Sequence, residues 1–162
     1  LLKCRYINVN RNDDLVGTEY SAIMKNVYSI AAGICFGIGY GDNFMAVLIS
    51  NSIRETEHFV DCVYPKHRDV KTSAYLGDLL VTAYSQYSRN RTFGNMIGKG
   101  YSVKFAKLEM KMVAEGYYAS KCVNDIQKKF ELNLPIADAV YQCLYKEKNP
   151  KKTFKSIQGL LK

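Results

Sequence analysis

The chain has 162 residues, of which 48% are hydrophobic and 23% charged. This length suits one domain with a sizeable core, and the composition excludes a disordered or fibrous chain. The net charge is +8, but residues 146–162 hold six Lys and one Glu, which leaves +3 for everything before them. We therefore expect a solvated basic tail and no nucleic-acid partner. The longest stretch without Asp, Glu, Lys or Arg, residues 26–41, contains four glycines and is shorter than the roughly 20 residues of a membrane span, so no membrane span is expected.

The five cysteines are widely spaced and form no Cys-x-x-Cys pair. This pattern predicts neither a disulfide framework nor a metal site, and it favours a reducing, cytoplasmic setting. The first residues, Leu1–Arg5, include no Met and no signal-peptide pattern. We expect the chain to be a fragment of a longer protein.

The N-terminal part contains one strand signal and one strong helix signal. Residues 5–9 alternate polar and apolar side chains, which predicts a strand, and a polar turn follows. Beyond about residue 20 the chain has helical patterns, and we expect the first helix to be central. It should end at the glycines 37, 39 and 41, while Ala31–Gly33 permit the close approach of a neighbouring helix. Its predicted buried face comprises Ile23, Val27, Ile30, Ile34 and Ile38.

The rest of the chain predicts a series of further helices. A second long helix should start with a cap at Asp42 or Asn43 and end before Pro65. Shorter helices are expected at about 78–84, 90–97, 102–109 and 115–130, and two more open at Pro135 and at Asn149-Pro150. The fold class is therefore an all-α multi-helix bundle with a short N-terminal β remnant.

Few residues point to chemistry by themselves. The glycines 37, 39 and 41 follow a helix, whereas a dinucleotide-binding loop follows a strand, so they indicate a helix end. Ser88-Arg89-Asn90 combines a helix cap with a guanidinium, a combination that suits a phosphate group. Asp78 lies in an apolar run and needs a charged partner, for which Lys25 and Arg89 are the candidates.

Taken together, several segments occur in a distinctive order. They are Met24–Val27 followed by Ala31–Gly33, Gly37–Asn43, Leu76–Leu79 followed by Thr82, Ser88–Gly94, Val113–Gly116 and Leu134–Tyr141. This series resembles the bacterial-type branch of the NAD(P)-dependent glycerol-3-phosphate dehydrogenase family, from about Asp14 to the end of the chain. Any one segment would be a weak signal, whereas several in register make the resemblance specific.

The resemblance implies a helical substrate-binding domain, similar to the C-terminal domain of 6-phosphogluconate dehydrogenase, at residues 21–162. Residues 1–20 would be a remnant of a Rossmann domain and its linker, and that domain would precede Leu1. The implied activity is the interconversion of dihydroxyacetone phosphate and sn-glycerol 3-phosphate with NAD or NADP as cofactor, which feeds glycerophospholipid synthesis. Without its Rossmann domain, the fragment is expected to be inactive.

The resemblance also implies roles for individual residues. Lys25 would be the catalytic proton donor to the substrate carbonyl and the acceptor in reverse. Arg89, Val113 and Glu115 would reach the cofactor. The residues implied to bind substrate are Lys25, Asn26, Asp78, Thr82, Ser88, Arg89 and Asn90.

Two departures from the family pattern and two alternative functions stay open. Residues 65–75 are basic where the family has a Gly/Asp-rich loop, and residues 84–87 replace a stretch of small residues and proline. One alternative is the helical domain of a related hydroxyacid or 6-phosphogluconate-type dehydrogenase, and the other is a basic, non-catalytic interaction module. The sequence does not distinguish NADH from NADPH or decide whether the protein is a homodimer.

Overall fold

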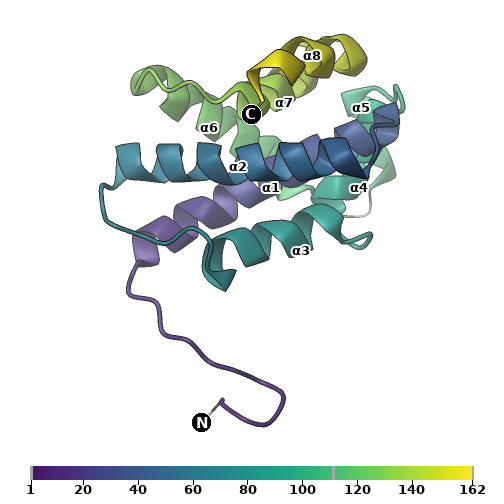
Figure 1. Ribbon diagram of the computed structural model, residues 1–162. Coiled ribbons are helices and arrows are strands. Elements are labelled where there is room, and N and C mark those ends of the chain that lie inside the picture. Colours follow the sequence, from purple (N-terminus) through teal and green to yellow (C-terminus); the bar gives the residue numbers. More distant parts are fainter. Residues whose placement is uncertain (1, 111, 162) are drawn as a thin grey trace.

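The computed structural model describes residues 2–110 and 112–161, and these residues form an all-α bundle (Figure 1). The predicted all-α multi-helix class is thereby confirmed. A π-helical segment, η1 (Ser73–Gly77), precedes the third helix, and a 3₁₀ turn, η2 (Gln158–Leu160), follows the last one. The α-helices of the described part are α1 (Leu15–Ile38), α2 (Asp42–Val63), α3 (Asp78–Tyr84), α4 (Arg89–Gly98), α5 (Val103–Glu109), α6 (Glu115–Lys129), α7 (Pro135–Tyr145) and α8 (Pro150–Ile157).

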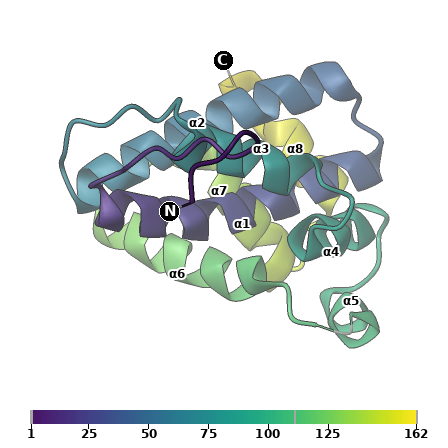
Figure 2. The ribbon, with the colours of Figure 1, turned by 90° about the horizontal axis from the view of Figure 1, so that it is seen from below.

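Helix α1 is the centre of the bundle, as predicted. It packs against α2, α3, α4, α6 and α7, and Figure 2 shows α6 on one side of it and α2 and α3 on the other. Residues 27–35 are buried all around the helix. The predicted buried face was therefore too narrow. The assignment of Ile23 to this face was wrong, because Ile23 is 38% exposed.

The closest helix packing in the bundle joins α1 to α4. Gly33 faces the backbone carbonyl of Arg91, and Gly94 faces the carbonyl of Ile30, so closely that a Cβ atom at either glycine would clash. Gly37 and Gly98 repeat this arrangement one turn further along the two helices. The small residues at 31–33 thus do permit the close neighbour that the sequence predicted, and α4 supplies matching glycines.

Several local predictions need correction. Among the described residues, 5–9 form no strand, and only an isolated bridge links Cys4 to Ile7, because no neighbouring strand pairs with this segment. Helix α1 begins at Leu15, earlier than expected, since the Asp14 side chain caps it. Helix α2 is capped by Gly41 without a side-chain bond, not by Asp42 or Asn43. Gly37 lies within the last turn of α1, and Gly39, with φ of 101°, ends the helix.

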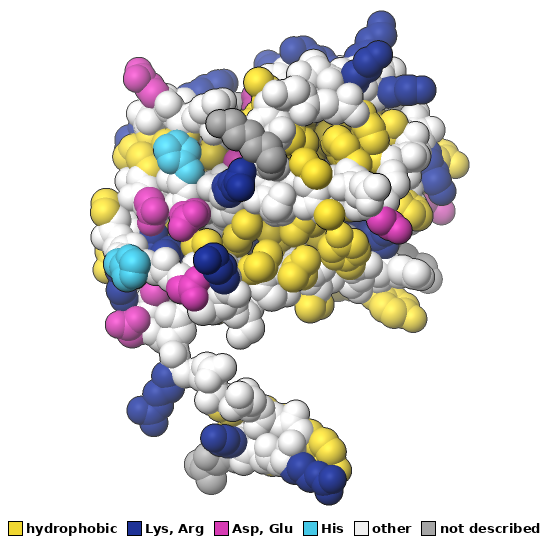
Figure 3. All heavy atoms as spheres, in the orientation of Figure 1, with side chains coloured by type: hydrophobic (Ala, Val, Ile, Leu, Met, Phe, Trp, Pro, Cys, Tyr) yellow, Lys and Arg dark blue, Asp and Glu magenta, His cyan; other side chains and the backbone are white. Residues whose placement is uncertain are grey.

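The surface agrees with the prediction for the basic tail. Lys151, Lys152 and Lys155 of α8 are exposed, and Lys and Arg side chains gather over this helix at the upper right of Figure 3. The N-terminal segment projects away from the bundle in the same view. Within the described residues, α1 is the one helix apolar and long enough to cross a membrane, with 61% of its most apolar 18-residue window buried in the bundle. A buried core helix meets the same criterion, and the absence of a membrane span stays a prediction.

A buried carboxylate joins α2 to the start of α7. Glu55, which is 7% exposed, accepts the backbone N–H groups of Ile136 at 2.8 Å and Ala137 at 3.2 Å, and the Tyr28 hydroxyl at 3.1 Å. Burial raises the pKa of Glu55, and these three donors offset only part of that rise, so that the pKa increases from its ordinary value of 4.5 to about 7. Glu55 therefore serves as the N-terminal cap of a helix far away in the sequence.

We expect Gly33→Ala to destabilise the domain by roughly 1–3 kcal/mol, because the added methyl group must force α1 away from α4. Chemical denaturation would measure the free energy of unfolding. Gly159→Ala is the matched control, since a Cβ atom there meets nothing within 4 Å. Equal effects of the two substitutions would contradict the close packing of α1 on α4.

We expect the free energy of unfolding to depend on pH through Glu55. Because its pKa is higher in the folded than in the unfolded state, the stabilisation is complete below about pH 4.5 and declines as the pH rises to about 7, by up to roughly 3 kcal/mol. Denaturation of Glu55→Gln across this range should lack that decline. Glu57→Gln, on the same helix, should keep it, and a decline of the same size in all three proteins would rule out Glu55 as its source.

Candidate functional site

The candidate site lies along one face of α1, where Lys25, Asn26 and Ser29 meet α3, α4 and α6. Lys25 Nζ forms an ion pair with Asp78 Oδ2 at 2.5 Å, and the two side chains are 23% and 40% exposed. The sequence left Lys25 and Arg89 as candidate partners of Asp78, and in the structure the partner is Lys25. Asp78 is the first residue of α3, which follows η1 without a break, and its side chain is directed towards the middle of α1.

Asn90, in the first turn of α4, connects α1 to α6. Its amide nitrogen donates to Asn26 Oδ1 at 3.0 Å, while its amide oxygen accepts the backbone N–H of Gly116 at 2.9 Å. Asn90 is 7% exposed, so both bonds are shielded from water. A Cβ atom at Gly116 would clash with the Asn26 carbonyl, which explains why a glycine occupies this position.

Two hydroxyl groups and a helix cap continue the network. The Ser29 hydroxyl donates to the Thr82 carbonyl at 2.9 Å and lies 2.9 Å from the Ser88 hydroxyl. Ser88 caps α4 by accepting the N–H of Arg91, and the Thr82 hydroxyl donates to the Asp78 carbonyl at 2.7 Å. Ser29 therefore holds the end of α3 and the start of α4 in place against α1.

Arg89 lies at the exposed edge of the site. Its guanidinium donates to the Val113 carbonyl at 3.3 Å and lies 3.6 Å from a Glu115 carboxylate oxygen. Both contacts are long, and the side chains of Arg89 and Glu115 are 44% and 67% exposed. Part of the planar donor surface of Arg89 is thus available to a ligand.

The structure places the sequence-predicted site residues in three neighbouring groups of contacts. Lys25, Asp78, Thr82 and Ser88 are linked through Ser29, Asn26 bonds to Asn90, and Arg89 contacts Val113 and Glu115. Two residues that take part were not predicted as site residues, namely Ser29 through its hydroxyl and Gly116 through its backbone N–H. Ser29 could have been predicted from the sequence, because a hydroxyl within the apolar stretch of a central helix needs a hydrogen-bond partner. Within the described residues, no group of three or more His, Cys, Asp and Glu side chains is arranged to hold a metal ion.

The network offers an ammonium group, a guanidinium group and a capped helix start to a ligand on the solvent side. These are groups that bind an anion, and Lys25 can also exchange a proton. Asp78 keeps the ammonium from swinging into solvent. The arrangement therefore suits a small anionic substrate that accepts or releases a proton.

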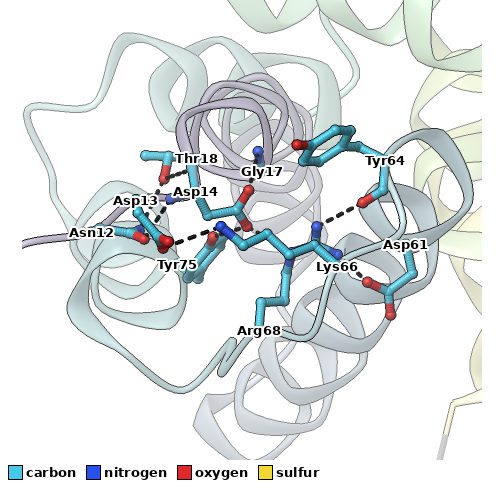
Figure 4. Close-up of polar contacts among 10 residues, drawn as sticks. All are labelled: Asn12, Asp13, Asp14, Gly17, Thr18, Asp61, Tyr64, Lys66, Arg68 and Tyr75. Carbon is cyan, nitrogen blue, oxygen red and sulfur yellow. Dashed lines mark hydrogen bonds and ion pairs between the residues drawn. The ribbon is translucent and has the colours of Figure 1, made fainter.

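A second polar cluster, also absent from the sequence predictions, surrounds the start of α1 (Figure 4). Asp14, which is 4% exposed, accepts the Gly17 N–H at 3.0 Å, Arg68 Nε at 2.8 Å and the Tyr75 hydroxyl at 2.6 Å. Burial raises the pKa of Asp14, but the bonds from Arg68, Tyr75 and Gly17 outweigh it and lower the pKa to about 2. Asp14, Arg68 and Tyr75 are called the Asp14 cluster below.

Comparison with known proteins identifies relatives of the whole bundle. A family model described as the NAD-dependent glycerol-3-phosphate dehydrogenase C-terminus matches residues 14–155. Glycerol-3-phosphate dehydrogenase (NAD(P)+) of Clostridium botulinum is 36% identical over 151 residues, which are 93% of this chain and 46% of the relative. The enzyme of that name from Staphylococcus carnosus is 36% identical over 154 residues, or 95% of this chain and 46% of the relative.

Solved structures support the same relationship. The crystal structure of glycerol-3-phosphate dehydrogenase from Coxiella burnetii superimposes with a TM-score of 0.90 at 30% identity, over 96% of this chain and 48% of that one. A Plasmodium falciparum glycerol-3-phosphate dehydrogenase, at 17% identity and a TM-score of 0.83, shares the fold. The chain thus spans about half the length of the relatives that it matches. It belongs to the NAD-dependent glycerol-3-phosphate dehydrogenase family and corresponds to the C-terminal part of its members.

Proposed function

We propose that this chain is the substrate-binding and catalytic domain, residues 21–162, of a cytoplasmic oxidoreductase that interconverts dihydroxyacetone phosphate and sn-glycerol 3-phosphate with NAD(P)H. The observation that carries the proposal is the Lys25–Asp78 ion pair at 2.5 Å, on the same face of α1 as the start of α4. Family membership supplies the reaction class, and free thiols at all five described cysteines fit a reducing compartment.

Lys25 is the proposed acid. When a hydride reaches the carbonyl carbon of dihydroxyacetone phosphate, negative charge develops on the carbonyl oxygen. An ammonium group beside that oxygen stabilises the charge and then donates the proton, and the neutral amine accepts it in the reverse reaction. Asp78 orients Lys25, and Thr82 fixes the Asp78 backbone through its bond to the Asp78 carbonyl.

The start of α4 is the proposed phosphate site. Ser88 caps the helix, and the adjacent Arg89 presents a planar fork of donors that matches two phosphate oxygens. Asn90 and Asn26 bond to each other at 3.0 Å, which keeps the polar wall between phosphate and carbonyl rigid. Together these residues would hold the substrate by its phosphate and aim its carbonyl at Lys25.

The cofactor residues suit a group that approaches from outside the bundle. Val113 and Glu115 are 57% and 67% exposed, and Arg89 bonds to both through contacts longer than 3 Å, which a ligand can displace. A nicotinamide cofactor, when bound, supplies or accepts the hydride. Most of its contacts would come from a Rossmann domain preceding Leu1, so residues 1–20 are proposed as the connection to that domain.

In the full-length enzyme, we expect Lys25→Ala to lower kcat by roughly 10²–10⁴, because both proton transfer and charge stabilisation are lost. Steady-state assays with dihydroxyacetone phosphate and NADH or NADPH would measure the loss, and cofactor binding should change little. Lys121→Ala, an exposed lysine on α6, is the control and should retain wild-type activity. A reduction of less than tenfold in Lys25→Ala would exclude Lys25 as the acid.

Arg89→Lys tests phosphate recognition, since it keeps the charge but loses the planar fork. We expect kcat/KM for dihydroxyacetone phosphate to fall roughly 10- to 150-fold, the effect of about 1.5–3 kcal/mol for a charged hydrogen bond. Unphosphorylated dihydroxyacetone, assayed in parallel, should lose much less. An equal loss on both substrates would assign Arg89 to the cofactor or the fold instead of the phosphate.

A further inference from the structure

The Asp14 cluster has an arrangement that the proposed reaction does not explain. Its guanidinium and carboxylate are almost completely buried, with the side chains of Arg68 and Asp14 only 3% and 4% exposed. Moving two opposite charges out of water costs about as much as their attraction returns, so such a pair is weak evidence for added stability. Such a pair can instead hold the segments that carry it in one geometry.

The cluster joins three segments that are distant in sequence. Asp14 caps α1, Tyr75 belongs to η1, and Arg68 lies in the loop between α2 and η1. Arg68 also donates to the Tyr64 carbonyl at 2.7 Å and pairs with Asp61, both at the end of α2 (Figure 4). The loop before the third helix is therefore held against the first turn of α1 at one buried carboxylate.

The cluster also connects to the Lys25–Asp78 pair through a closed ring of contacts. The Tyr75 hydroxyl donates to Asp14, and the Tyr75 carbonyl accepts the backbone N–H of Asp78. The Asp78 carboxylate accepts Lys25, and Lys25 lies on the helix that Asp14 caps, roughly three turns further along. The elements that carry Lys25 and Asp78 are thus both bonded to the Asp14 carboxylate.

We propose that Asp14 and Tyr75, supported by Arg68, are positioning residues that set the placement of Asp78 against Lys25. Their effect on catalysis rests on the proposed function, whereas their effect on Asp78 does not. Of the three, Tyr75 reaches the candidate site through its backbone carbonyl, which accepts the Asp78 N–H. They act by preventing η1 from shifting along α1, which would separate the carboxylate of Asp78 from the ammonium of Lys25.

The test uses Tyr75→Phe and Asp14→Asn in the full-length protein. Tyr75→Phe keeps the buried ring and removes one bond. Asp14→Asn keeps the helix cap, because asparagine caps helices as well as aspartate does, and removes the charge opposite Arg68. Asp13→Asn is the matched control, since this neighbouring side chain is 93% exposed and, within the described part of the chain, pairs with Lys66 alone, at 3.1 Å.

The first readout is independent of activity. Hydrogen exchange of a peptide covering residues 73–80, followed by mass spectrometry, should be roughly tenfold faster in Tyr75→Phe and Asp14→Asn than in wild type and Asp13→Asn. Unchanged exchange would overturn the proposal, even if the protein turned out to catalyse another reaction. If wild type did not convert dihydroxyacetone phosphate, the proposed function would fail while this readout still decided the role of the cluster.

The second readout separates positioning from general stability. Tyr75→Phe should lower kcat roughly tenfold and leave the KM for the cofactor within about twofold. In an Asp78→Asn background, the same substitution should have almost no further effect, because the group that it positions has already been altered. Additive losses in the double variant would show that Tyr75 acts independently of Asp78 and would overturn the proposal.

Discussion

The close approach of α1 to α4 is the constraint on which the rest of the structure depends. Gly33 and Gly94 bring the two backbones together, so that the first turn of α4 lies directly over the polar residues of α1. Only at this separation can the short amide of Asn90 reach Asn26, and the hydroxyl of Ser88 reach Ser29. The arrangement of polar side chains is thus a consequence of two stretches of small residues.

Much of the fold was predictable from local sequence because helix ends carry local signals. The cap Asn149 and Pro135 in a first turn placed their helices to within a residue or two, and the helix predicted at 102–109 starts one residue later, at Val103. The Lys25–Asp78 pair was one of two pairings left open, since a carboxylate in an apolar run requires a cation and Arg89 was the other candidate. The prediction of a strand at residues 5–9 was wrong, because the alternation of polar and apolar residues does not by itself supply a neighbouring strand to pair with.

The Asp14 cluster could not be predicted from local sequence signals. Asp14 is more than fifty positions from Arg68 and Tyr75, and no periodicity links a capping aspartate to an arginine and a tyrosine so far along the chain. The resemblance to the family did not help either, because residues 65–75 are where the chain departs from the family pattern.

The cap that Glu55 provides for α7 has a consequence for synthesis on the ribosome. Glu55 and Tyr28 emerge early, whereas Ile136 and Ala137 emerge much later. Until then, the carboxylate lacks the two backbone donors that satisfy it in the finished bundle, and water must hydrate it. The first helices to emerge therefore cannot close their own core, and the nascent chain has to keep that side of α2 open until α7 arrives.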